Sequence, residues 1–191
     1  MDAITALQQR NSSARLSEPA PIGEDRNAIF QAALRAPDHA RLRPWRFLTV
    51  EGDDRLTLGA KMASAAKFDN PELDAAIYEK LKLAPLRAPL LVIVIAKISE
   101  HPKVPEVEQI LSAGAAATKL LTAAHALGYA GIWRTGSVSF SRTFMNSIGL
   151  QANEKMVGFI YLGTADGPSK TLPDMAVDDF FQVWRSVGQS K

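Results

Sequence analysis

The sequence feature that most constrains the fold is an uninterrupted apolar run at positions 90–95, Leu-Leu-Val-Ile-Val-Ile. A strand with one face in water alternates apolar and polar residues, whereas this run is apolar on both faces. It is therefore predicted to be a central strand of a sheet that is covered on both sides. The full apolar run, residues 89–96, is far shorter than the about 20 residues that a membrane-spanning helix needs.

A long alanine-rich segment at positions 106–126 predicts a helix, and Gly128 fits the left-handed position just after its last turn. Small side chains leave little bulk on one face of this helix. A sheet, a second helix or a planar ligand could therefore approach it closely. The chain then turns into a strand at 132–133, which leads to Arg134-Thr135-Gly136.

The other patterns predict a sheet with interspersed helices. Strands are expected at 45–50, 90–95, 132–133 and 155–164, and helices at 24–34 and 106–126, after the caps Asp2 and Asp53, from Asn70, and after Ser139 or Ser141. The first helix should carry Ile4 and Leu7 on its inner face. This succession indicates one mixed α/β (α+β) domain over residues 1–191. We expect a three-layer sandwich with a central mixed sheet of four to five strands and helices on both faces.

The C-terminal segment, residues 174–191, is very apolar for a chain end. Val177, Phe180, Phe181 and Trp184 recur there at helical spacing. So much aromatic surface is expected to dock on something, and a second subunit is the candidate.

The composition excludes several classes of protein. The chain has no cysteine, which removes disulfides, thiolate nucleophiles and cysteine-ligated metals. A formal net charge of +2 is too small to argue for nucleic acid as a partner. The start of the chain has no basic region followed by an apolar core, so a cytoplasmic protein without a membrane segment is expected.

Two arginine-containing segments are candidates for binding an anion. Arg10 and Arg15 bracket polar residues at the end of the first helix, and arginine grips phosphate with several donors at once. The alternative is a solvated helix end, which this segment alone favours. The second segment, residues 34–47, combines four arginines with His39 just before a strand. A lone loop histidine is usually solvent-exposed or structurally hydrogen-bonded, but this density of cations favours an anionic or planar aromatic partner.

Motifs for other chemistries are missing. The sequence has no Gly-x-Gly-x-x-Gly after a strand, no phosphate loop and no Gly-x-Ser-x-Gly elbow. The histidines, His39, His101 and His125, are widely scattered, so no metal site is expected.

Four segments together resemble the FMN-dependent nitroreductase family, most closely its compact YdjA-type branch. They occur in the family's order and span nearly the whole chain. The segments are Arg10-Asn11-Ser12, Ala36-Pro37-Asp38-His39 leading to Pro44-Trp45-Arg46-Phe47, Gly131-Ile132-Trp133-Arg134-Thr135-Gly136, and Gly158-Phe159-Ile160-Tyr161-Leu162-Gly163-Thr164.

The resemblance implies a homodimer with two FMN sites at the subunit interface. It also implies electron transfer from NADH or NADPH to small oxidised acceptors, such as nitroaromatics or quinones, in two half-reactions. The flavin carries the hydride, so no side-chain nucleophile or acid–base pair is needed. A non-catalytic flavin-binding storage or sensing module is the alternative.

The same resemblance implies site residues by motif position. Arg10, Asn11 and Ser12 should hold the FMN phosphate and ribityl chain, and Lys170 is a further phosphate ligand. Arg35 and His39 should lie at the flavin, and Trp133, Arg134 and Thr135 at its ring edge. The nicotinamide nucleotide is expected to border Ala123, Ala124, His125, Ala126, Leu127 and Gly128.

One departure from the family concerns the cation near the flavin pyrimidine edge. A basic residue common two positions after the serine is replaced here by Ala14, and Arg35 or Arg15 can take its place. Arginine suits this role because it stays charged at any working pH. The alternative for Arg35 is a pair with a nearby carboxylate such as Asp38.

Overall fold

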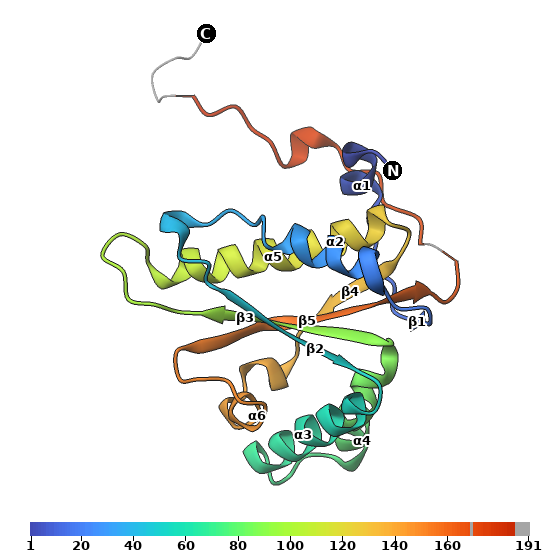
Figure 1. The fold of residues 1–191 in the computed structure, drawn as a ribbon, viewed down its shortest axis with the longest axis vertical. Coiled ribbons are helices and arrows are strands. Elements are labelled where there is room, and N and C mark those ends of the chain that lie inside the picture. The colour runs from blue at the N-terminus through green and yellow to red at the C-terminus, as the bar shows by residue number, and fades with distance from the viewer. Residues whose placement is uncertain (169, 186–191) are drawn as a thin grey trace.

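A five-stranded sheet lies between two layers of helices in the computed structural model, which describes residues 1–168 and 170–185. Figure 1 shows α2 and α5 on one face of the sheet and α3, α4 and α6 on the other. The elements are α1 Ala3–Gln9, β1 Leu16–Ser17, α2 Gly23–Ala33, β2 Trp45–Glu51, α3 Asp54–Asp69, α4 Ala75–Leu83, β3 Leu90–Lys97, α5 Glu106–Ala126, β4 Ala130–Arg134, α6 Arg142–Ser147 and β5 Glu154–Ala165, with 3-10 turns at His39–Arg41, Ala84–Arg87, Ser137–Phe140 and Val177–Asp179. The predicted three-layer sandwich is confirmed.

Strand β5 is the centre of the sheet, whose order is β1-β5-β3-β2 with β4 also paired to β5. Leu162 of β5 lies opposite Leu90 of β3 on one side and opposite Gly131 of β4 on the other. All these strand pairs are antiparallel. In the described part of the chain, the parallel pairing expected of a mixed sheet is confined to one isolated bridge between Ser12 and Gly131.

Strand β3 confirms the prediction made from its apolar run. Its residues alternate between two cores, and all of them up to Ala96 are buried. Val92 and Val94 pack with α2 and α5, whereas Ile93 and Ile95 pack with α3 and α6. Each fully buried side chain of this size stabilises the fold by about 1.5–3 kcal/mol, so the strand anchors both layers.

Local capping determines several helix boundaries. Asp2 accepts hydrogen bonds from two backbone amides of α1, and Ser141 accepts one from Phe144, as predicted. Helix α4 begins later than Asn70, because Asp74 caps it through the amides of Ala76 and Ile77.

The expected inner face of α1 is wrong. Ile4 and Leu7 are each 62% exposed, and Ala6 is the buried residue of this helix. Periodicity identified an apolar stripe, but no element of the described part of the chain buries it.

The C-terminal segment leads away from the three layers (Figure 1). Phe180, Phe181 and Trp184 are 65%, 76% and 85% exposed. Residues 186–191 of the segment that was predicted to dock lie outside the described residues.

Candidate functional site

A polar cavity of about 290 Å³ lies between the end of α1 and the end of β5. The chain leaves the helix at Arg10 and then runs beside β4, where the Ser13 amide donates to the Gly131 carbonyl at 3.2 Å. The Asn11 side-chain amide donates to the Lys170 carbonyl at 2.9 Å. The lining residues are Asn11, Ser12, Ser13, Ala14, Arg15, Ala165, Asp166, Gly167, Pro168 and Lys170. The structure thus brings together three residues predicted to bind phosphate, Asn11, Ser12 and Lys170.

Arg10 directly precedes the cavity residue Asn11, and its guanidinium has no partner among the described residues. The residue is half-buried, and its side chain makes no hydrogen bond or ion pair with any residue at positions 1–168 or 170–185. A partly desolvated guanidinium gains most from an anionic partner. Arg15 and Lys170 add positive charge to the cavity, where Asp166 is the acidic lining residue.

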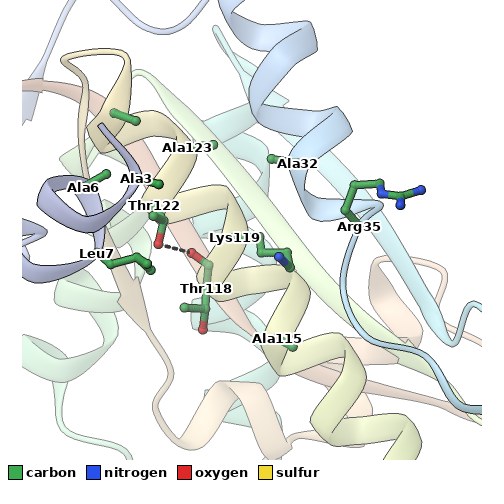
Figure 2. Close-up of a pocket in the computed structure, with 11 residues that line it drawn as sticks. Ala3, Ala6, Leu7, Ala32, Arg35, Ala115, Thr118, Lys119, Thr122 and Ala123 are labelled. Atoms are coloured by element: carbon green, nitrogen blue, oxygen red, sulfur yellow. Dashed lines mark hydrogen bonds between the residues drawn. The ribbon is translucent and has the colours of Figure 1, made fainter. Parts of the chain in front are cut away.

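An apolar groove of about 710 Å³ runs between α1, α2 and α5 (Figure 2). We call it the α5 groove. It is lined by Ala3, Ala6, Leu7, Ala32, Arg35, Ala115, Thr118, Lys119, Thr122, Ala123 and Ala126. Small side chains on three helices leave this depression in the surface.

Arg35 lies at the edge of the α5 groove, on the side opposite α1 (Figure 2). Its guanidinium has no ion pair with a described carboxylate, so the alternative pairing with Asp38 is not present there. Asp38 instead accepts a hydrogen bond from the Arg43 backbone amide at 2.7 Å. Arg35 is therefore available to a ligand or to a second subunit.

The predicted nicotinamide segment is the last turn of α5 and the turn after it. Ala123 and Ala126 line the α5 groove. Ala124 is fully buried in the core, and the His125 Nε2 atom is buried without a hydrogen-bond partner among the described residues. Leu127 and Gly128 follow on the surface, and Gly128 has the predicted left-handed conformation, with φ of 88°. Only part of this segment therefore faces open space.

His39 is held at the other end of α5. Its Nδ1 atom lies 2.7 Å from a carboxylate oxygen of Glu108, in the first turn of that helix. The loop after it carries Ala40, Arg41 and Arg43 at φ of 60°, 55° and 48°. Left-handed backbone at non-glycine residues is strained and tends to cluster at functional sites.

Trp133 and Arg134 point to opposite faces of the sheet, because they are neighbours on β4. The Trp133 indole packs against α5, where a Cβ added at Gly114 would lie 3.6 Å from the ring. Its Nε1 donates to the Val157 carbonyl at 3.4 Å. The space beside Gly114 is thus taken by a planar side chain of the protein itself.

Arg134 and Thr135 line a second cavity, of about 300 Å³, on the α3–α4 face. We call it the lower cavity. Its lining residues are Met62, Ile77, Lys80, Leu81, Ala84, Arg87, Arg134, Thr135, Gly136, Ser137, Val138, Phe159 and Tyr161. Burial raises the pKa of Tyr161, and the nearby charges of Arg134 and Arg87 oppose that rise.

Sequence reasoning missed Lys80 and Arg87 as cavity residues. Ile77, Lys80 and Leu81 lie on one face of α4, but apolar periodicity gives no reason to single out the lysine of such a face. Arg87 follows in the 3-10 turn that leads to β3, a place without periodicity to interpret.

The predicted site residues do not form one cluster within a single chain. The Arg10–Ser12 segment lies beside Gly131, which packs against Leu121 of α5. His39 instead pairs with Glu108. At about 1.5 Å of rise per residue, Glu108 and Leu121 lie about 20 Å apart along α5.

Metal-binding clusters and membrane-spanning helices are both absent from the described residues. Residues 1–168 and 170–185 contain no group of three or more side chains suited to hold a metal ion. No helix in the same ranges has the length and apolarity required to cross a membrane.

Comparison with known proteins identifies the family of this chain. The model of the Nitroreductase family matches residues 7–164. The chain belongs to the Nitroreductase family, which confirms the resemblance inferred from the four motifs.

Individual relatives agree with this assignment. Over 167 residues the chain is 43% identical to the Escherichia coli (strain K12) protein YdjA, an NAD(P)H nitroreductase by name, covering 86% of this chain and 88% of YdjA. The fold is similar to that of a nitroreductase-like family protein from Bacillus cereus, with a TM-score of 0.81, 17% identity and 96% of each chain covered. It is also similar to the FMN-dependent nitroreductase NfnB from Mycobacterium smegmatis in complex with NADPH, with a TM-score of 0.73, 17% identity, and 96% and 98% of the two chains covered.

Proposed function

We propose that this protein is an FMN-dependent oxidoreductase that takes electrons from NADH or NADPH and passes them to small oxidised acceptors such as nitroaromatics or quinones. The observation that carries the proposal is Arg10, half-buried and without a partner among the described residues, next to Asn11 of the cavity that Ser12 and Lys170 also line. Membership of the Nitroreductase family supports it. NfnB, of the same fold, is named as FMN-dependent and in complex with NADPH. A cytoplasmic location, where both nicotinamides are available, is part of the proposal.

The residues at the polar cavity fit the phosphate and ribityl chain of FMN. Arg10 and Lys170 would neutralise the phosphate charge, and Ser12 supplies a hydroxyl that donates or accepts. The Asn11 amide holds the two cavity segments together by donating to the Lys170 carbonyl. These four residues bind and orient the cofactor.

The cofactor's ring edge is assigned to the end of β4. Arg134 and Thr135 lie there, and Arg134 is positively charged at any working pH. When bound, FMN would supply the hydride chemistry, because it accepts hydride from a nicotinamide and returns electrons to an acceptor. The protein's part is to hold the ring, to leave one ring face open and to stabilise negative charge near it.

We infer that the working unit is a homodimer in which the α5 groove faces a second copy. The groove is lined mostly by small apolar residues, together with Leu7 of α1. Ile4 of α1 and Val107 and Leu111 of α5 are further exposed apolar side chains on helices that border it. Exposed apolar surface of this kind marks an interaction site. Docking of the C-terminal aromatic residues on the partner belongs to the same proposal.

A dimer also supplies what one chain lacks. Arg35 and His39 lie along α5, away from the Arg10 segment of the same chain. We propose that they reach the cofactor held by the partner. Each site would then contain residues of both subunits.

Two measurements test the function. The purified protein reconstituted with FMN should retain flavin absorbance after gel filtration, and it should oxidise NADPH when a quinone such as menadione is added. A protein that binds FMN but gives no turnover with either nicotinamide would be a storage or sensing module. A protein that does not retain FMN would refute the proposal.

A further inference from the structure

The lower cavity has two cations, Lys80 and Arg87, that the proposed cofactor site does not explain. Lys80 and Arg87 from the α4 segment and Arg134 from β4 all line it. None of the described residues that line it is acidic. The three side chains make no hydrogen bond or ion pair with residues 1–168 and 170–185, and the Arg134 Nε atom is buried without a partner there.

Apart from Thr135, Gly136 and Ser137, the rest of the lower cavity is apolar or aromatic. Met62, Leu81 and Phe159 form part of its wall, together with the buried ring of Tyr161. At about 300 Å³ the cavity is at the small end of the range for ligand pockets, which suits a single ring. Cations and apolar side chains that line the same cavity complement a ligand with a flat apolar body and one anionic end.

We propose that the lower cavity is an acceptor subsite that selects a single aromatic ring bearing a carboxylate. This inference rests on the proposed function, because Arg134 and Thr135 connect the cavity to the proposed flavin edge. Lys80 and Arg87 receive the carboxylate, and the apolar wall receives the ring.

The test uses the full chain with saturating FMN and the ligand pair benzoate and benzamide, which differ in charge but hardly in shape. Isothermal titration calorimetry should show tighter binding of benzoate. Lys80→Gln and Arg87→Gln should each weaken benzoate binding about tenfold, since each removes one charge-assisted contact. Lys82→Gln is the matched control. Lys82 is exposed on α4, the helix that carries Lys80, but it pairs with Glu79 at 3.6 Å and does not line the cavity.

A kinetic comparison gives a second readout. The ratio of kcat/KM for 4-nitrobenzoate to that for 4-nitrobenzamide, followed by NADPH consumption, should fall about tenfold in each of the two cavity variants. Lys82→Gln should retain the wild-type ratio.

Three results would overturn the subsite: benzoate affinity unchanged in both cavity variants, benzamide affinity reduced as much as benzoate affinity, or FMN affinity reduced by the same factor. The last result would mean that the flavin itself occupies the cavity. Failure of the menadione assay with the benzoate result intact would refute the proposed oxidoreductase function and leave the anion site standing.

Discussion

Replacement of Glu154 by Gln is expected to destabilise the protein, because this carboxylate is the buried half of an ion pair. Its side chain is 3% exposed, and both oxygens accept from Arg46, at 2.7 Å each. The Gln151 backbone N–H also donates to the Glu154 carboxylate, at 2.9 Å. The pair joins the start of β5 to β2, at one end of the sheet.

The magnitude follows from the unequal burial of the two partners. Breaking a fully buried pair costs about 3–5 kcal/mol, much of it from the charge left unpaired. The Arg46 side chain is 36% exposed and can regain water, so we expect a loss of about 2–3 kcal/mol. With a slope of about 2 kcal/mol per molar urea, the unfolding midpoint should fall by about 1–1.5 M.

The loss should depend on pH. The hydrogen-bonded Arg46 guanidinium holds the pKa of Glu154 below its ordinary value of 4.5. A carboxylate whose pKa is lower in the folded chain contributes stability above its unfolded pKa, and loses it as the pH falls through the folded pKa. The difference between wild type and variant should therefore be full at pH 7 and shrink below pH 4.5.

The matched control is Glu51→Gln. Glu51 also accepts two hydrogen bonds from an arginine, Arg26, but the Arg26 side chain is 24% exposed and the Glu51 side chain 50% exposed. Exposed pairs contribute about 0–1 kcal/mol, so this variant should unfold close to wild type. Urea unfolding, monitored by circular dichroism at pH 7 and pH 4, measures the free energy of unfolding of both variants. Equal losses from Glu154→Gln and Glu51→Gln would refute the argument from burial.

Three further predictions concern the proposed cofactor site and dimer. Arg10→Ala should weaken FMN binding by about 1.5–3 kcal/mol without unfolding the protein, and an unchanged dissociation constant in a fluorescence titration would remove Arg10 from the site. Truncation after Pro173 should give monomer or aggregate that loses FMN, and sedimentation showing a yellow dimer would assign the tail another role. Arg35→Gln should lower the flavin reduction potential by a few tens of millivolts, because about 30 mV corresponds to roughly 1.4 kcal/mol for a two-electron couple. Spectroelectrochemistry with saturating FMN measures it, and an equal or higher potential would point to another cation, with Arg15 next.

The parts of the fold predicted correctly are those whose signal is local. The apolar run of β3, the helical segment 106–126 and the Asp2 cap each depend on residues close together in sequence. The exposure of Ile4 could not be predicted, because an apolar stripe does not reveal whether anything covers it.

The candidate site shows the same limit. Motif order assigned Asn11 and Lys170 to one end of the cofactor, and the structure joins them across 159 positions. Period-two alternation places Trp133 and Arg134 on opposite faces, but the choice of face depends on how β4 packs against α5. Lys80 was missed because a charged residue on a helix face gives no sequence signal that a cavity lies beside it.

The distance along α5 between the Arg10 segment and His39 has a genetic consequence. If each cofactor takes Arg10 from one subunit and His39 from the other, lesions in these two residues complement one another. A mixed dimer of an Arg10→Ala chain and a His39→Ala chain would carry both lesions in one site and neither in the other. Two alleles with impaired sites, expressed together, would then give mixed dimers that each contain one intact site.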